Sequence, residues 1–88
     1  MPVEQIKMYG TTWCPDCARA KRILSKHKVP FEWFDITYNE EASAYVQEVN
    51  GGYRSVPTIL FPDGTVLVEP SNTKLEKKLA SLGLLSLQ

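Results

Sequence analysis

The sequence predicts one α/β domain, spanning residues 1–88, with the element order β-α-β-α-β-β-α. Three observations predict it. Runs of alternating or continuous apolar residues are separated by segments with helical periodicity. Two short strand-like runs near the C-terminal end flank a Pro-Asp-Gly turn, which is typical of a β-hairpin. A chain of 88 residues is also the size of a single small domain.

The first half of the chain contains two strands and two helices. Residues 6–9 predict a strand that ends at Gly10. From residue 15 onward, apolar side chains recur every three or four positions and basic ones fill the other face, which predicts an amphipathic helix ending near residue 28. The run 29–36 is rich in aromatic and β-branched residues and predicts a second strand. Asn39 is an N-cap candidate for a second helix.

That second helix has apolar residues at positions 42, 45, 46 and 49 and is predicted to end at Gly51. Residues 58–61 and 65–68 predict the hairpin, and Ser71 or Asn72 caps a last helix that ends at Gly83. Two strands joined through a helix are parallel with a right-handed crossover, whereas hairpin strands are antiparallel. The sequence therefore predicts a four-stranded mixed sheet flanked by helices.

Charge and hydropathy exclude several classes of partner. The formal net charge is zero, so no global field attracts nucleic acid or an anionic membrane surface. The first ten residues lack the apolar region of a signal peptide, and no run approaches the ~18 apolar residues of a membrane span. We therefore expect a cytoplasmic protein. In that compartment a lone pair of close cysteines is not expected to be a structural disulfide.

The two cysteines lie at the start of the first predicted helix. Pro15 fits the first helical position, where its missing N–H leaves no hydrogen bond unmade, and this makes Cys14 the N-cap. The free N–H groups and the positive end of the helix dipole favour the Cys14 thiolate, which is the nucleophilic form. Cys17 lies one turn later on the same face and can reach Cys14. The spacing suits one sulfur that attacks and one that resolves.

Other readings of the cysteine pair need different partners. A structural zinc site needs four ligands, and the one histidine, His27, lies ten residues beyond Cys17, about 15 Å along a helix. A copper ion or an iron–sulfur cluster shared between two chains stays open, because soft thiolates suit both. Two inert buried cysteines are a further alternative. A C-x-x-C motif beside a βαβ pattern favours redox chemistry.

The motifs resemble those of the glutaredoxin-like proteins of the thioredoxin superfamily, and the mycoredoxins most closely. The resemblance rests on Trp-Cys-Pro-Asp-Cys at 13–17, Ser-Val-Pro-Thr at 55–58 and the stretches 50–58 and 61–71, and it covers most of the chain. It implies the thioredoxin/glutaredoxin fold and a thiol–disulfide oxidoreductase in which Cys14 attacks and Cys17 resolves. It implies no bound cofactor, and a low-molecular-weight thiol as co-substrate: mycothiol, bacillithiol or glutathione.

The resemblance also implies a substrate-binding surface. In this family the proline at position 57 is cis and faces the attacking cysteine, so the main chain of Val56 can pair with an extended substrate. An ordinary trans proline at the start of an edge strand is the alternative for Pro57. Trp13 offers a flat apolar platform to a partner or packs partly into the core, and Pro15 adjoins it.

The chain departs from the glutathione-using pattern at two places. Thr11 stands where those proteins often have lysine, and Val-Glu-Pro-Ser-Asn-Thr-Lys at 68–74 replaces a Gly-Gly-x-x-Asp segment. Both departures favour a thiol other than glutathione. Ser71 and Asn72 either bind a substrate carboxylate through main-chain N–H groups or only cap the last helix. Arg54 either binds a carboxylate or is solvated.

Asp16 is expected to tune the site. A carboxylate between the two cysteines opposes the helix dipole, raises the thiol pKa and favours a more reducing couple. The expected partners are client proteins that carry disulfides, together with a low-molecular-weight thiol or a flavin disulfide reductase, and the protein is expected to be a monomer. Two alternative functions are a thioredoxin-like electron donor of the kind that serves ribonucleotide reductase, and metal binding by a thiolate-bridged dimer.

Overall fold

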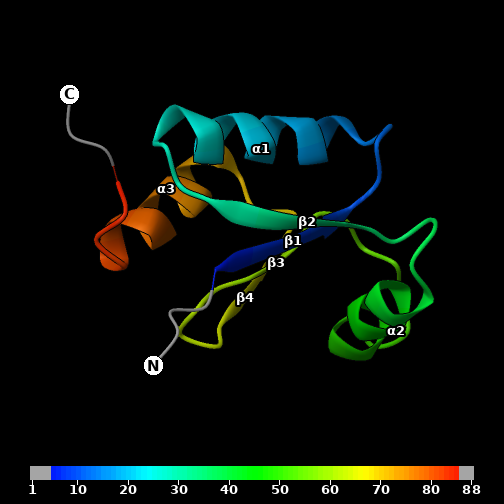
Figure 1. The fold of residues 1–88 in the computed structure, drawn as a ribbon. Helices are drawn as coiled ribbons and strands as arrows, with labels where there is room; N and C mark the ends of the chain where they lie inside the picture. The colour runs from blue at the N-terminus through cyan, green and yellow to red at the C-terminus, as the bar shows by residue number, and fades with distance from the viewer. Residues whose placement is uncertain (1–4, 86–88) are drawn as a thin grey trace.

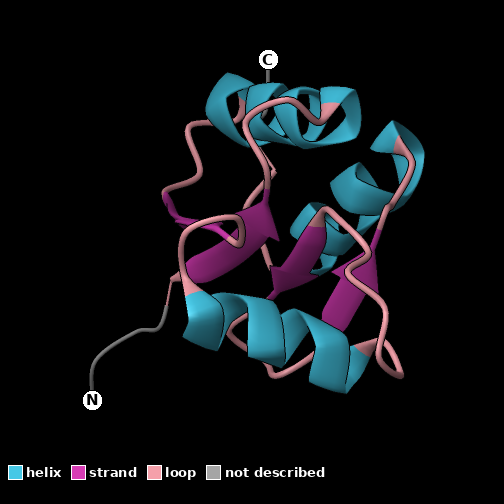
Figure 2. Cartoon of the chain, turned by 90° about the vertical axis from the view of Figure 1, so that its right-hand side faces the viewer, coloured by secondary structure: helices cyan, strands magenta, loops and turns pink. Residues whose placement is uncertain are grey.

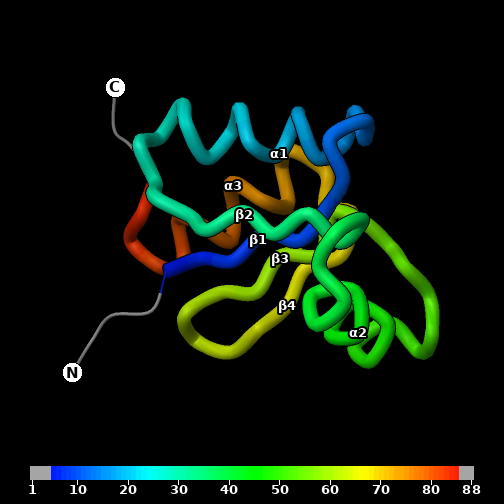
Figure 3. Tube along the Cα trace, turned by 45° about the vertical axis from the view of Figure 1, so that its right-hand side comes forward, coloured from blue at the N-terminus to red at the C-terminus, as the bar shows by residue number. Residues whose placement is uncertain are grey.

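The computed structural model describes residues 5–85 and confirms the predicted element order (Figure 1). The elements are β1 Ile6–Gly10, α1 Pro15–Lys26, β2 Phe31–Asp35, α2 Glu40–Val49, β3 Thr58–Leu60, β4 Val66–Val68 and α3 Asn72–Ser81. The four strands form one mixed sheet in the order β2-β1-β3-β4, which Figure 3 allows the reader to follow. β1 is parallel to β2 and antiparallel to β3, and β3 is antiparallel to β4. The predicted fold class is therefore confirmed.

The turn between α1 and β2 is longer than the sequence predicts. α1 ends at Lys26, and Lys28 adopts a left-handed conformation with φ 56°. The N–H of Val29 then donates to the carbonyl of Leu24 at 2.9 Å, which closes the helix. Because residue 29 completes this helix end and Pro30 has no N–H to donate, β2 begins only at Phe31.

The helices lie on both faces of the sheet (Figures 1 and 2). α1 and α3 cover one face, and their buried side chains meet those of the strands in the larger core cluster: Ile6, Met8, Ala20, Ile23, Leu24, Val29, Ile59, Phe61, Leu75 and Leu79. α2 covers the other face, where Ala42 and Val46 pack against Tyr9 and Ile36. Alternation along β1 explains the division, because Ile6 and Met8 point to one face and Tyr9 to the other.

The α2 face is thin and partly aromatic. The Tyr9 ring stacks on that of Phe34, with the ring centroids 4.9 Å apart. The Tyr45 ring also contacts Tyr9, and these two centroids are 4.8 Å apart. The sequence places Val49 on the apolar side of α2, yet that residue is 40% exposed. Val46 in the same turn is fully buried, so the last turn of α2 packs on the sheet through Val46 while Val49 lies at its margin.

Polar contacts fasten α3 to the elements beside it. Glu76 accepts from His27 Nε2 at 3.1 Å and lies 3.6 Å from Lys26 Nζ, which joins the end of α1 to the middle of α3. Lys78 Nζ donates to Asp63 in the hairpin turn at 2.7 Å. Within residues 5–85, no helix is long and apolar enough to cross a membrane.

The contact between Glu76 and α1 predicts an acid-sensitive contribution to stability. The hydrogen bond from His27, followed by the charge of Lys26, holds the Glu76 pKa below its ordinary value. The contact therefore stabilises the fold above the unfolded-state pKa, and this contribution is lost as the pH falls through the lowered folded-state pKa. Glu76→Gln should lower the melting temperature at pH 7, and its difference from wild type should shrink between pH 7 and pH 3. Glu32→Gln, on the exposed face of β2, is the control. A constant difference across this range would contradict the assignment.

Candidate active site

Cys14 lies in the loop after β1 and is the N-cap of α1, as the sequence predicts. Its backbone is extended, with φ −85° and ψ 115°, and Pro15 occupies the first helical turn. The Cys14 Sγ accepts a hydrogen bond from the main-chain N–H of Cys17 at 3.1 Å. The sulfur therefore lies at the positive end of the helix dipole and against a free helix donor, both of which favour negative charge on it.

Cys17 is the buried member of the pair. It is 1% exposed, whereas Cys14 is partly exposed, and both are free thiols. Burial, together with the hydrogen bond that its thiol shares with Cys14, raises the pKa of Cys17 to about 12. The backbone of Thr11 and the charge of Lys21 act in the opposite direction and are weaker than burial. The arrangement gives one sulfur that solvent can reach and one protonated sulfur held directly behind it.

Two residues that were not predicted to be part of the site, Gly10 and Trp33, lie close to the Cys17 sulfur. A Cβ at Gly10 would overlap the Cys17 Sγ and would lie 2.9 Å from the end of the Trp33 ring. The ammonium group of Lys21 sits 3.5 Å from the centroid of that ring. Gly10 therefore leaves the room in which a buried sulfur and an indole ring meet the end of β1. The sequence signal for this role of Gly10 is a glycine at the end of a strand, just before the loop that carries the cysteines.

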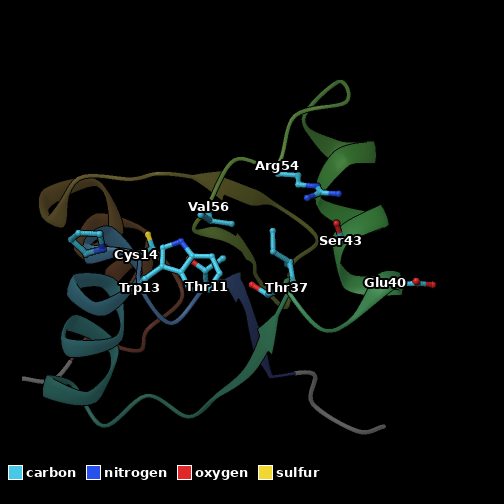
Figure 4. A pocket seen from close by; sticks show the side chains of 10 residues that line it. Thr11, Trp13, Cys14, Thr37, Glu40, Ser43, Arg54 and Val56 are labelled. Carbon is cyan, nitrogen blue, oxygen red and sulfur yellow. The ribbon is translucent and has the colours of Figure 1, made fainter.

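A groove of about 710 Å³ opens beside Cys14 (Figure 4). Five of the residues expected at the site line it: Trp13, Cys14, Pro15, Arg54 and Val56. The other lining residues were not expected to bind substrate: Thr11, Ile36, Thr37, Glu40 and Ser43. Figure 4 shows Trp13 and Cys14 on one side and the α2 residues on the other.

The residues not expected in the groove have a common place in the fold. Thr37 follows β2, and Glu40 and Ser43 belong to the first turns of α2. The carboxyl ends of the parallel strands β1 and β2 meet at this edge of the sheet, so the loops that follow them enclose one space. Parallel pairing of the first two strands was predicted from the sequence and was the signal that could have placed Thr37 beside Cys14.

The groove has a mixed lining. Trp13, Pro15, Ile36 and Val56 supply apolar surface, Arg54 supplies a guanidinium, and Thr37 and Ser43 supply hydroxyl groups. Figure 4 shows the Glu40 carboxylate pointing away from the other labelled side chains. The Thr11 Oγ1 atom is buried and has no hydrogen-bond partner in the structure, which is uncommon for a hydroxyl group. The groove therefore offers a ligand both apolar contact and hydrogen-bonding groups.

The peptide bond between Val56 and Pro57 is cis, as the resemblance implied. Pro57 is buried, and its carbonyl accepts from the N–H of Glu69 at 2.9 Å. Val56 is partly exposed and lines the groove beside Cys14. Its position leaves main-chain groups next to the reactive sulfur.

Ser71 and Asn72 do not line the groove. The Ser71 Oγ accepts from the N–H of Lys74 at 3.1 Å and so caps α3. The Asn72 Oδ1 accepts from Arg19 at 2.7 Å. The same guanidinium donates to Asp16 at 2.9 Å, so the carboxylate expected to tune the cysteines lies in an ion pair.

The side chains do not assemble a metal site in the part of the chain that the structure describes. Among residues 5–85, no group of three or more His, Cys, Asp and Glu side chains is close enough to hold an ion. His27 caps the far end of α1 and contacts Glu76, one helix length away from the cysteines.

Comparison with known proteins gives consistent matches. The glutaredoxin family model matches residues 6–67. A Mycobacterium tuberculosis protein whose name assigns it to the glutaredoxins is 38% identical over 77 residues, which cover 88% of this chain and 92% of the relative. Mycoredoxin 1 of Corynebacterium glutamicum is 31% identical over 80 residues, covering 91% of this chain and 99% of the relative.

Solved structures agree with these relatives. A crystal structure of a thioredoxin-like protein superimposes with a TM-score of 0.75 at 29% identity, over 85% of this chain and 99% of the other. The crystal structure of a glutaredoxin from Archaeoglobus fulgidus superimposes with a TM-score of 0.67 at 28% identity, over 83% of each chain.

The asymmetry of the two sulfurs predicts selective alkylation. At pH 8, a thiol with a pKa of about 12 is ionised in about one molecule in ten thousand, and Cys17 is also buried. Iodoacetamide should therefore label the native reduced protein once, at Cys14, and label Cys17 only after denaturation. Peptide mass spectrometry locates the adduct, and Cys14→Ser, which should remain unlabelled when folded, is the control. Equal labelling of both cysteines would refute the asymmetry.

The packing around Gly10 predicts the effect of one added methyl group. Gly10→Ala should lower the free energy of unfolding by about 1–3 kcal/mol and slow closure of the Cys14–Cys17 disulfide, because the methyl displaces the Cys17 sulfur. Urea denaturation and the rate of thiol loss measure the two effects. Gly64→Ala is the comparison, since its methyl meets open space although φ is +88°. It should reduce stability and leave the closure rate unchanged; a similar slowing in both variants would contradict the role of Gly10.

Proposed function

Because the chain belongs to the glutaredoxin family, and is therefore a thiol–disulfide oxidoreductase that works with disulfide substrates and thiol reductants, we propose that it reduces mixed disulfides between proteins and a low-molecular-weight thiol. The observation that carries the proposal is the asymmetric dithiol. Cys14 is accessible and hydrogen-bonded at a helix N-terminus, whereas Cys17 is buried and protonated. The roles of attacking and resolving sulfur follow from that difference.

The first step is an attack by the Cys14 thiolate on one sulfur of the substrate disulfide. A new S–S bond forms to Cys14, the substrate S–S bond breaks, and the departing sulfur leaves as a thiolate that takes a proton from water. In the second step, Cys17 gives its proton to water and its thiolate attacks the Cys14 sulfur. The Cys14–Cys17 bond forms, the mixed disulfide bond breaks and the bound thiol leaves as a thiolate. Alternatively, the thiolate of a second thiol molecule attacks the sulfur bound to Cys14, which releases the Cys14 thiolate and forms the oxidised disulfide of the thiol.

The high pKa of Cys17 fits this order of events. Two of its causes, the hydrogen bond with Cys14 and the charge of that sulfur, depend on Cys14 being reduced. Once Cys14 carries a substrate thiol, both causes disappear, and the Cys17 pKa falls towards the part set by burial. Cys17 therefore becomes a better nucleophile when a mixed disulfide is present for it to resolve.

The groove is the proposed binding site of the thiol co-substrate. Arg54 offers one guanidinium, and Thr37 and Ser43 offer hydroxyl groups, beside the apolar side chains of the same groove. One guanidinium pairs with one carboxylate, whereas glutathione carries two, and this supports a thiol other than glutathione. The relative named mycoredoxin 1 supports mycothiol as the first candidate, and bacillithiol and glutathione are the alternatives to compare with it.

The proposed protein clients contact the rim of the groove. Trp13 is 67% exposed beside Cys14, so its ring is available to an apolar side chain of a client. Within residues 5–85, no hydrogen bond occupies the main chain of Val56, which supports pairing with an extended segment around the client disulfide. A flavin disulfide reductase that reduces the oxidised thiol pool completes the proposed cycle in the cytoplasm, with the enzyme as a monomer.

The test uses single-cysteine variants and a protein substrate that carries mycothiol, bacillithiol or glutathione as a mixed disulfide. Cys14→Ser should lose all reductase activity, because no other accessible thiolate lies at the helix N-terminus. Cys17→Ser should take the thiol adduct onto Cys14, and intact-protein mass spectrometry identifies the adduct. We expect mycothiol to transfer fastest. Arg54→Ala should slow its transfer by about tenfold, the order expected for one charged hydrogen bond to a ligand.

Three outcomes would count against the proposal. Activity retained by Cys14→Ser and lost by Cys17→Ser would reverse the two roles. Equal rates for the three thiols, with no effect of Arg54→Ala, would exclude the groove as a specific thiol site. Absence of transfer from all three thiols, with wild-type activity on a protein disulfide intact, would favour a thioredoxin-like protein electron donor.

A further inference from the structure

Arg19 contacts three acceptors from two parts of the chain. Its guanidinium donates to Asp16 Oδ1 at 2.9 Å and to Asn72 Oδ1 at 2.7 Å, and it lies 3.5 Å from the carbonyl oxygen of Pro70. Asp16 is one of the two residues between the cysteines, whereas Pro70 and Asn72 belong to the segment that enters α3. One side chain therefore joins the first turn of the cysteine-bearing helix to the start of the last helix.

The position of Asp16 makes its carboxylate a competitor of the Cys14 sulfur. Asp16 lies in the first turn of α1, where the positive end of the helix dipole attracts an anion. The Cys14 sulfur lies at the same end and accepts the N–H of Cys17. A carboxylate released from other contacts would turn towards this end of the helix and place a negative charge beside the thiolate.

Arg19 draws the carboxylate away from this end of the helix. The ion pair spans three residues along α1, so the Asp16 side chain lies along the helix surface rather than over its end. The guanidinium is itself held by Asn72 and by the carbonyl of Pro70, and its side chain is only 31% exposed. Asp16 thus has a partner fixed by tertiary contacts.

We propose that Arg19 is a positioning residue for the dithiol: it holds the Asp16 carboxylate off the helix N-terminus and offsets its charge, so that Cys14 remains an effective nucleophile. The inference rests on Cys14 being the attacking sulfur of the proposed function. It assigns to Arg19 the control of a charge that would otherwise oppose the thiolate.

The contact of Arg19 with Pro70 also links α1 to the loop that carries Val56 and Pro57. The N–H of Glu69 donates to the carbonyl of Pro57, and Glu69 immediately precedes Pro70. Arg19 therefore ties α1 to the segment that carries this hydrogen bond. Through these links, the loop bearing Val56 and Pro57 is connected to the helix that bears the cysteines.

The experiment measures alkylation of Cys14 by iodoacetamide at pH 7 in four proteins, all with Cys17→Ser: the parent, Asp16→Asn, Arg19→Gln and the double variant. Alkylation by this small neutral reagent needs no disulfide substrate, so its result is independent of which thiol or client the enzyme uses. We expect Arg19→Gln to react about three- to fivefold more slowly than the parent, the range that a partly exposed ion pair allows. Asp16→Asn should change the parent rate by less than about twofold but should restore most of the rate lost in Arg19→Gln.

Two further variants separate positioning from general effects. Arg22→Gln removes one positive charge from an exposed position of the same helix and should leave the rate unchanged. Arg19→Lys keeps a charge that can pair with Asp16 and should recover most of the rate. Melting temperatures identify any variant that fails to fold.

The proposal is overturned if Arg19→Gln reacts as fast as Arg22→Gln. It is also overturned if the effect of Asp16→Asn is the same with and without Arg19, because the two charges would then act independently and Arg19 would not control the carboxylate. A slow Arg19→Lys variant would likewise contradict it. If Arg19→Gln is too unstable for the measurement, Arg19→Met, which keeps an unbranched side chain but removes the charge, takes its place in the same comparison with Asp16→Asn.

Discussion

The hydrogen bond from the Cys17 N–H to the Cys14 sulfur is the interaction on which the rest of the site depends. It can form only because α1 starts immediately after Cys14, with Pro15 in its first turn. The same bond gives the helix a cap and gives the sulfur a donor suited to a thiolate. Its geometry also puts Cys17 behind Cys14, where burial raises the pKa of the second thiol. Helix capping thereby places two identical side chains in different environments, and the proposed division of roles rests on that difference.

The sheet supplies the second requirement, which is room for the buried sulfur and a groove for the substrate. Gly10 ends β1 without a side chain, and this allows the Cys17 sulfur and the Trp33 ring to approach the strand end. Because β1 and β2 are parallel, the loops that follow them open at one edge of the sheet, and α2 closes the far side of the groove. The cysteines thus come from one helix, and one wall of the groove beside them comes from another.

The electrostatics of the first turn of α1 combine local and distant contributions. The sequence predicts that Asp16 opposes the thiolate, and in the structure this carboxylate is paired with Arg19. Arg19 is in turn fixed by groups that precede and begin α3. The side chains of Ser71 and Asn72, which the sequence offers either as carboxylate-binding residues or as helix caps, cap α3 and contact Arg19. The groove on the α2 side, with the Arg54 guanidinium and the hydroxyl groups of Thr37 and Ser43, is the proposed site of thiol recognition.

The sequence by itself determined the order of strands and helices, the caps at Cys14 and Asn39, the hairpin turn and the reactive cysteine pair. Each of these depends on residues within three or four positions of one another, so the local pattern contains the physical cause. The cis bond before Pro57 followed only from the family resemblance, because local sequence favours trans at most such bonds. Tertiary structure alone decided that Thr37, Glu40 and Ser43 share a groove with Arg54, and that Arg19 meets Asn72 across 53 residues. Such pairings depend on how the helices pack on the two faces of the sheet, and the spacing of residues along the chain does not predict that packing.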